Sequence, residues 1–175
     1  MEVLVLAALD QALSDRSASF AIAVGDNFSR EKIWRETSRQ LQLNAFPALI
    51  HPRAHVSSFS AVGPGSVVMA GAMIGANTKV GNFCIVNTQA ALDHDNCLGD
   101  FASIAPGAVT GGGVTLGERA AIGIGAAIKH NVSIGADVVV GAQSYLNKDA
   151  HGPCVMYGTP ARLIRVRELG EPYLD

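Results

Sequence analysis

The sequence is poor in aromatic residues and contains few cysteines. Phe, Tyr and Trp make up only 6% of its 175 residues, although 49% of the chain is hydrophobic. Such a core must be built from small and branched aliphatic side chains, which favours thin, regular layers. The three cysteines, Cys84, Cys97 and Cys154, form no CxxC pair, which excludes a zinc knuckle or redox motif of that type. The odd cysteine count and the lack of a signal peptide favour a reducing compartment, so we expect a cytoplasmic protein.

Strong charge of one sign and long apolar runs are also missing. The formal net charge is −2, which gives no reason to expect a nucleic acid or an anionic membrane as partner. No apolar run approaches the roughly 18 residues that a membrane span requires. The sequence therefore predicts a protein that binds neither nucleic acid nor membrane.

An aliphatic residue recurs at every sixth position from Val56 to Leu146. Fifteen of these sixteen positions are aliphatic, and Thr110 is the exception. The next residue is often Gly, which accepts corner conformations that other residues resist, and the residue two places earlier is usually small. In a helix the apolar stripe would instead repeat about every 3.6 residues. The six-residue period predicts a short strand followed by a corner, with three such units closing a triangular coil.

Stacked coils of this kind form parallel strands around a core of aliphatic side chains. Sixteen units give about five coils, and at roughly 4.8 Å between neighbouring strands the prism is about 24 Å tall. The open ends need covers because they expose strand edges. The segment 156–166 is typical of a strand, a Gly/Pro turn and a short amphipathic helix. We therefore expect a mainly β fold with a β-helix over 51–150 and a C-terminal capping segment over 151–175.

Residues 1–50 do not follow the six-residue repeat. A strand that ends in Gly25 in front of a helix N-terminus is an arrangement that binds phosphate groups, and Asp26 or Asn27 is suited to cap that helix. We interpret 1–50 as part of a small α/β, Rossmann-like nucleotide-binding domain, or alternatively as a segment that only packs against the β-helix. The expected elements are helices over 4–14 and 29–43 and strands over 20–25 and 46–50.

One of the five histidines, His94, lies between two aspartates within the repeat. It comes two places after Leu92, at a corner where the side chain points outward. A neighbouring carboxylate raises the basicity of an imidazole and fixes its tautomer, and such an imidazole can act as a general base. The alternative is a solvated polar corner without a function.

The stretch 86–142 resembles the sialic-acid O-acetyltransferase family of hexapeptide-repeat acyltransferases, which includes bacterial enzymes that N-acetylate UDP-4-amino-sugars. Its most specific parts are NTQAALDHD (87–95) and GDFASIAPGA (99–108). IAVGDNFSREKI (22–33) resembles the nucleotide-sugar domain of that family, although the family's opening glycine-rich segment has no counterpart here. The resemblance implies an N-terminally shortened member with a left-handed parallel β-helix, acetyl-CoA as co-substrate and a homotrimer. It implies a sugar or nucleotide sugar as the acceptor.

The resemblance also assigns roles to individual residues. His94 matches the general base, and Asp95 matches the acidic residue that orients it. Asn87 and Gly25 match positions that contact the acceptor. Ser103 stands where relatives have a second histidine that contacts coenzyme A. The matching positions of the coenzyme A groove are Ser103, Gly123, Ile124, Gly125 and Ala142.

The implied reaction is a direct acetyl transfer. His94 takes a proton from an acceptor amine or hydroxyl as it attacks the thioester, and backbone N–H groups stabilise the oxyanion. No metal is expected, since His94 and His130 lie two coils apart at one corner. Their backbones are separated by roughly 9.6 Å, too far for one zinc at about 2.1 Å from each nitrogen. A serine-type small-molecule O-acetyltransferase and a non-catalytic β-helix scaffold stay open as alternatives.

Overall fold

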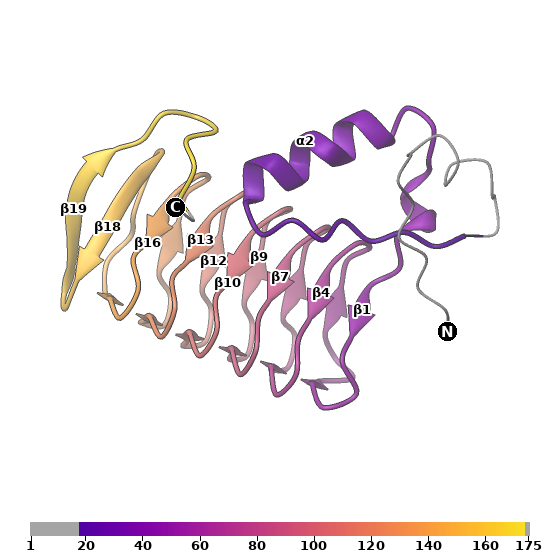
Figure 1. Cartoon of the computed structure of the whole chain (residues 1–175). Helices are drawn as coiled ribbons and strands as arrows, with labels where there is room; N and C mark the ends of the chain where they lie inside the picture. The colour runs from indigo at the N-terminus through magenta and orange to yellow at the C-terminus, as the bar shows by residue number, and fades with distance from the viewer. Residues whose placement is uncertain (1–17, 174–175) are drawn as a thin grey trace.

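The computed structural model describes residues 18–173, and the helix expected over 4–14 lies outside the described residues. Figure 1 shows an elongated stack of coils with one helix, α2 (Asn27–Thr37), along one side. The strands β18 and β19 lie at the end of the stack farthest from β1. Within residues 18–173, no helix is long and apolar enough to cross a membrane.

Three parallel sheets form the sides of the stack, and we name them sheets A, B and C. Within the coils a strand pairs with the strand eighteen residues further on, as in Leu49↔Val67, and only the C-terminal pair of strands departs from this spacing among the described residues. Sheet A contains β1 (Leu49–Ile50), β4 (Val67–Val68), β7 (Ile85–Val86), β10 (Ser103–Ile104), β13 (Ala121–Ile122), β16 (Val139–Val140), β18 (Cys154–Gly158) and β19 (Ala161–Val166). Sheet B contains β2 (His55–Val56), β5 (Met73–Ile74), β8 (Ala91–Leu92), β11 (Val109–Thr110), β14 (Ala127–Ile128) and β17 (Tyr145–Leu146). Sheet C contains β3 (Ala61–Val62), β6 (Lys79–Val80), β9 (Cys97–Leu98), β12 (Thr115–Leu116) and β15 (Ser133–Ile134).

The solenoid confirms the prediction of triangular coils with an aliphatic interior. It has about six turns rather than five, because the first coil already begins at β1. The second residue of a strand points inward and the first points outward, so Ile74 is fully buried while Met73 is exposed. Thr110, the exception in the repeat, is also buried, and among the described residues its hydroxyl has no hydrogen-bond partner.

At the corners, the residue with the unusual backbone conformation is not the one that the sequence predicted. Positive φ angles recur every six residues from Gly65 to Gln143, at the third position after each inward aliphatic residue. The glycine directly after the aliphatic residue, as at Gly99, does not have a positive φ. Gly99 is needed for space instead, because a Cβ there would lie 2.7 Å from the backbone nitrogen of Glu118 on the next coil.

The N-terminal segment contains less regular structure than the sequence predicts. The expected strand over 20–25 is extended chain, because no neighbouring strand pairs with it in the described part of the chain. The expected helix over 29–43 is α2 followed by a short 3-10 helix, Leu43–Ala45, and the expected strand over 46–50 is only β1. Asp26 caps α2, since its carboxylate accepts a hydrogen bond of 2.8 Å from the Ser29 N–H.

An aromatic cluster joins the N-terminal segment to the solenoid. Trp34 of α2 packs edge-on against Phe46, with ring centroids 5.2 Å apart, and lies 4.7 Å from Phe83. Phe83 stacks on Phe101 at 5.4 Å. Phe83 and Phe101 occupy the corner between sheets C and A on successive coils, so α2 lies along that corner.

The C-terminal segment forms a hairpin instead of the expected strand and helix. β18 pairs in parallel with β16 and antiparallel with β19, with Tyr157 opposite Arg162. The expectation of a helix after the turn was wrong. The open edge of β18 needs hydrogen-bond partners along its whole length, and a strand supplies them where a helix cannot.

Candidate active site

His94 and Asp95 lie side by side at the corner between β8 of sheet B and β9 of sheet C. The His94 Nδ1 atom is 2.6 Å from the Asp95 Oδ2 atom. The backbone N–H of His94 donates to the carboxylate of Asp93 at 2.8 Å. Asp95 has a φ of 58°, a left-handed conformation that aspartate tolerates better than most residues. The corner thus orients the imidazole through its sequence neighbours.

The surroundings of His94 favour a basic, accessible imidazole. The hydrogen bond to Asp95 raises the pKa of His94, and the charge of Asp93 raises it further. The hydrogen bonds from His94 and Asn77 hold the pKa of Asp95 below its ordinary value. The His94 side chain is 61% exposed. Because Nδ1 is bound to the carboxylate, Nε2 is the nitrogen that faces solvent and can accept a proton.

Glycines of the coil between His94 and His130 make room for both imidazole rings at this corner. A Cβ on Gly112 would lie 2.5 Å from Cε1 and 2.7 Å from Nε2 of His94. A Cβ on Gly111 would lie 2.6 Å from Nδ1 of His130. Both histidines line one cavity of about 450 Å³, which we name the histidine cavity, together with Asp93, Asp95, Gly112, Gly113 and Asn131. The sequence spacing had placed His130 at this corner but had not predicted that it shares a cavity with His94.

We expect Gly112→Ala to lower kcat about 10- to 100-fold, because the added methyl group displaces the His94 ring from its position. The melting temperature should stay close to that of the wild type, since His94 is exposed and its ring can move. Steady-state kinetics and a thermal melt test this expectation. Gly135→Ala is the control, because a Cβ there keeps at least 3.2 Å from its neighbours. Equal activity of the two variants would show that Gly112 does not position His94.

A second cavity, of about 330 Å³, lies on the outer face of sheet A, and we name it the sheet A cavity. Outward residues of β7, β10, β13 and β16 form its floor, and the following corners form one wall. Among its lining residues are six that the sequence assigned to acceptor or coenzyme A binding: Gly25, Asn87, Ser103, Gly123, Ile124 and Ala142. Gly125 does not line it, and its φ of 63° places it at the left-handed position of the corner.

Two polar side chains aim hydrogen-bonding groups at the sheet A cavity. The Asn87 carboxamide oxygen accepts a hydrogen bond of 2.7 Å from the Thr88 N–H, which leaves its NH2 group to donate toward a ligand. Ser103 contacts the hydroxyl of Tyr173, which reaches the cavity from the C-terminal segment. Sequence reasoning missed Tyr173, because no pattern in the chain connects that segment to sheet A.

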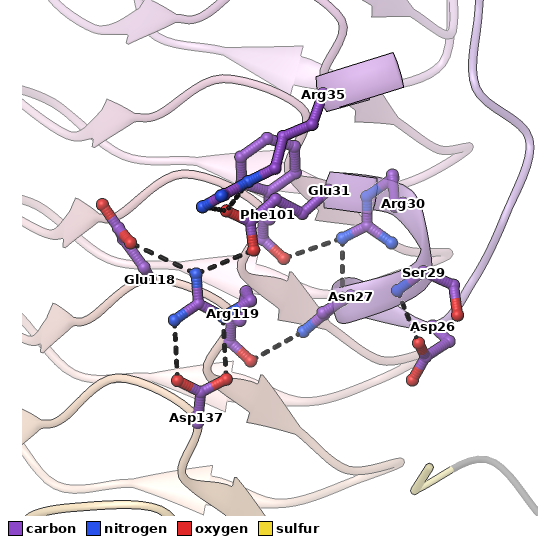
Figure 2. A network of polar contacts seen from close by, with 10 residues as sticks. All are labelled: Asp26, Asn27, Ser29, Arg30, Glu31, Arg35, Phe101, Glu118, Arg119 and Asp137. Atoms are coloured by element: carbon purple, nitrogen blue, oxygen red, sulfur yellow. Dashed lines mark hydrogen bonds and ion pairs between the residues drawn. The ribbon is translucent and has the colours of Figure 1, made fainter. Parts of the chain in front are cut away.

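Arg30 of α2 lies within a polar network at the start of the helix (Figure 2). Its Nη1 donates to the carbonyl groups of Val24 and Gly25, both at 2.9 Å. The other nitrogens donate to the carbonyl groups of Phe83 and Phe101 at 2.8 Å, so Arg30 bridges the N-terminal segment and two coils. Burial lowers the pKa of Arg30, yet these acceptors satisfy the guanidinium.

A second arginine extends this polar network along the same corner (Figure 2). Arg119 forms two hydrogen bonds of 2.8 Å with Asp137 and one of 2.9 Å with Glu31 of α2. The contact with Asp137 is the main cause that raises the pKa of Arg119. Asn27 donates to the carbonyl groups of Arg119 and Ala120. The start of α2 is therefore fixed to the solenoid beside the sheet A cavity.

One chain does not bring the two cavities together. His94 lies at the corner between sheets B and C, which in a triangular coil is opposite sheet A. The residues assigned to the acceptor and coenzyme A lie on sheet A and its corner with sheet B, except Gly25, which lines the sheet A cavity from the segment in front of α2. Among residues 18–173, no group of three His, Cys, Asp or Glu side chains is placed to hold a metal ion.

Comparisons with known proteins agree with the fold. Residues 113–148 match a family model described as bacterial transferase hexapeptide (six repeats). The acetyltransferase domain of PglB from Neisseria gonorrhoeae, solved with acetyl coenzyme A, is 36% identical at a TM-score of 0.79, over 83% of this chain and 70% of that one. PerB from Caulobacter crescentus, solved with CoA and GDP-perosamine, is 36% identical at a TM-score of 0.82, over 88% and 75%.

A third structure, a variant of GDP-perosamine N-acetyl transferase from Caulobacter crescentus with the same two ligands, is 35% identical. Its TM-score is 0.82, and the match covers 88% of this chain and 74% of that one. A comparison with curated protein sequences found no match.

Proposed function

The chain belongs to the hexapeptide-repeat acetyltransferases, and on that basis we propose that it transfers the acetyl group of acetyl-CoA to the amine of a nucleotide-linked amino sugar. The observation that carries the proposal is the 2.6 Å contact between His94 and Asp95 at an exposed corner. The similar PerB structure contains CoA and GDP-perosamine, which supports a sugar amine rather than a small-molecule hydroxyl as acceptor. Membership in the acetyltransferases also argues against a non-catalytic scaffold. The cytoplasmic location expected from the sequence stays a prediction.

In the proposed reaction His94 acts as the general base. The neutral amine attacks the thioester carbonyl carbon, and Nε2 of His94 takes the proton that the nitrogen loses as the C–N bond forms. Asp95 stabilises the resulting imidazolium through its contact with Nδ1. The tetrahedral intermediate then collapses, the C–S bond breaks, and the proton on His94 passes to the departing thiolate of coenzyme A.

We propose that the active site forms between subunits of a homotrimer. His94 lies opposite sheet A, so a neighbouring copy must bring its own His94 to the cavity that holds the acetyl group. Sheet B presents a row of outward apolar side chains, Met73, Val109 and Tyr145, which are 46%, 41% and 37% exposed. Such a row suits a subunit contact. Light scattering should therefore give three times the mass of one chain, and a fully active monomer would contradict the shared site.

The proposed function is tested by incubating the protein with acetyl-CoA and a panel of nucleotide-linked amino sugars that includes GDP-perosamine and a UDP-4-amino-sugar. Release of the coenzyme A thiol and a mass increase of one acetyl group on the sugar are the expected results. GDP-perosamine whose amine is already acetylated serves as the control, because it offers no free amine to accept a second acetyl group. Binding of acetyl-CoA without transfer to any amino sugar would refute the acceptor class, and no binding of acetyl-CoA would refute the transferase.

A further inference from the structure

Tyr173 reaches the sheet A cavity from the C-terminal segment, far along the chain from the other lining residues. Its hydroxyl oxygen is 3.2 Å from the Ser103 Oγ atom and 3.4 Å from the carbonyl oxygen of Gly25. The cavity is lined by all three residues. Tyr173 therefore joins β10 and the segment in front of α2 at one end of the cavity.

The segment that carries Tyr173 is held by Arg167. Arg167 is largely buried, and its Nη1 donates to the carbonyl group of Asp137 at 3.0 Å. Its guanidinium lies over the Tyr173 ring at 5.7 Å from the ring centroid. Arg167 also contacts the carbonyl group of Glu171, and Glu171 forms an ion pair with Arg165. These contacts fold the segment back onto the solenoid and fix the direction of the ring.

The hydroxyl of Tyr173 is available as a hydrogen-bond donor. Burial raises the pKa of Tyr173, so the phenol stays protonated at neutral pH. The carbonyl of Gly25 can only accept, so Tyr173 donates either to Gly25 or to Ser103. Both oxygen–oxygen distances exceed the roughly 2.7–2.8 Å that is usual for a hydrogen bond from a hydroxyl group. A ligand oxygen that enters the cavity can therefore take the donor without breaking a short hydrogen bond.

The polar groups that line the cavity come from one end of it along the stack. Asn87 follows β7, Ser103 lies in β10 and Tyr173 contacts Ser103, whereas the coils of β13 and β16 contribute Ile124, Val139 and Ala142. Backbone N–H groups along the floor are already used, since those of Ser103 and Ala121 donate to the next coil. A ligand carbonyl at the polar end must therefore be met by side chains.

We propose that Tyr173, together with Ser103, binds the thioester carbonyl oxygen of acetyl-CoA. This inference rests on the proposed function, because the acetyl group must lie at the end of the cavity nearest Gly25 and Asn87, which match acceptor positions. As the amine attacks, the carbonyl oxygen gains negative charge and the hydrogen bond from Tyr173 strengthens. No proton moves to or from Tyr173 in this step. At this end of the cavity the side-chain donors of Tyr173 and Ser103 thus take the place of the backbone donors expected from the sequence.

Isothermal titration calorimetry with acetyl-CoA and with coenzyme A tests the inference on wild type and Tyr173→Phe. We expect the variant to bind acetyl-CoA about 3- to 10-fold more weakly, the value of one hydrogen bond, and to bind coenzyme A unchanged. Coenzyme A lacks the carbonyl that Tyr173 contacts, which is why the two ligands should separate. Ser103→Ala should show the same separation, and the two losses should not add fully in the double variant. Tyr157→Phe is the control, because Tyr157 is 50% exposed and lies outside the lining of the sheet A cavity.

Other outcomes overturn the inference in distinguishable ways. Equal weakening of both ligands would show that Tyr173 only holds the C-terminal segment in place. Unchanged binding would show no contact with the ligand, and tighter binding would show that the segment obstructs the cavity. A wild-type protein that binds neither ligand would refute the proposed function and this inference with it, whereas wild-type binding that Tyr173→Phe leaves unchanged refutes this inference alone.

Discussion

Replacement of His94 by Ala is expected to lower kcat by roughly 10²- to 10⁴-fold, the contribution of a positioned general base. The affinity for acetyl-CoA should stay close to the wild-type value, because in the proposed reaction Nε2 of His94 acts on the acceptor amine and not on acetyl-CoA. Steady-state kinetics and calorimetry on the same preparation measure the two quantities. His151→Ala is the matched control, since His151 is also an exposed histidine but lies outside both cavities.

The pH dependence of kcat/KM supplies an independent test of the same role. A general base works only when it is deprotonated, so the acid limb of the profile follows the pKa of His94. Asp95 is the main cause that raises this pKa. Asp95→Asn should therefore move the acid limb to lower pH while also lowering the plateau, because the ring loses its orienting partner. An acid limb that stays in place would mean that another group sets it, and a His94→Ala enzyme with wild-type kcat would exclude His94 as the base.

The coil architecture was predictable because each feature of the repeat corresponds to one local position. An inward aliphatic residue such as Ile74 must recur wherever a strand turns its second residue to the core. The corners were harder to predict, because a corner can need both a residue without a side chain and a residue in the left-handed conformation within four positions. Gly99 satisfies the close approach of the next coil, while the left-handed conformation falls two positions later, at Phe101. Sequence alone does not separate a glycine chosen for space from one chosen for conformation.

The candidate site was predictable only where its contacts are local. His94 and Asp95 are adjacent in the chain, so the sequence itself shows that they can meet. Tyr173 and Ser103 are seventy residues apart, and their contact depends on how Arg167 directs the last segment. Gly112 lies between these cases, because it follows His94 by one eighteen-residue coil and its proximity can be read from the repeat once the coil length is known.

Arg30 illustrates a buried charge whose role no sequence pattern indicated. It is 1% exposed, and its partners are carbonyl groups of the N-terminal segment and of two coils together with the side chain of Asn27. Without the guanidinium these buried acceptors lose their donor, and each acceptor left unsatisfied costs about 1–3 kcal/mol. The solenoid itself is built from repeated contacts between neighbouring coils, so the loss should stay local rather than spread along the stack.

Arg30→Met should therefore release α2 from the solenoid while the coils remain folded. Hydrogen exchange is the direct measurement, and we expect the α2 amides to exchange about 10²- to 10³-fold faster, as about 1.4 kcal/mol corresponds to tenfold. Amides of β10 and β13 should change much less. Arg35→Ala is the matched control on the same helix, because the Arg35 side chain is 74% exposed and Glu31 keeps its contact with Arg119 without it. Equal acceleration of exchange in α2 and in the coils would contradict this expectation. It would mean that the Arg30 network and the solenoid unfold as one cooperative unit, so that Gly25 could not move without unfolding of the coils.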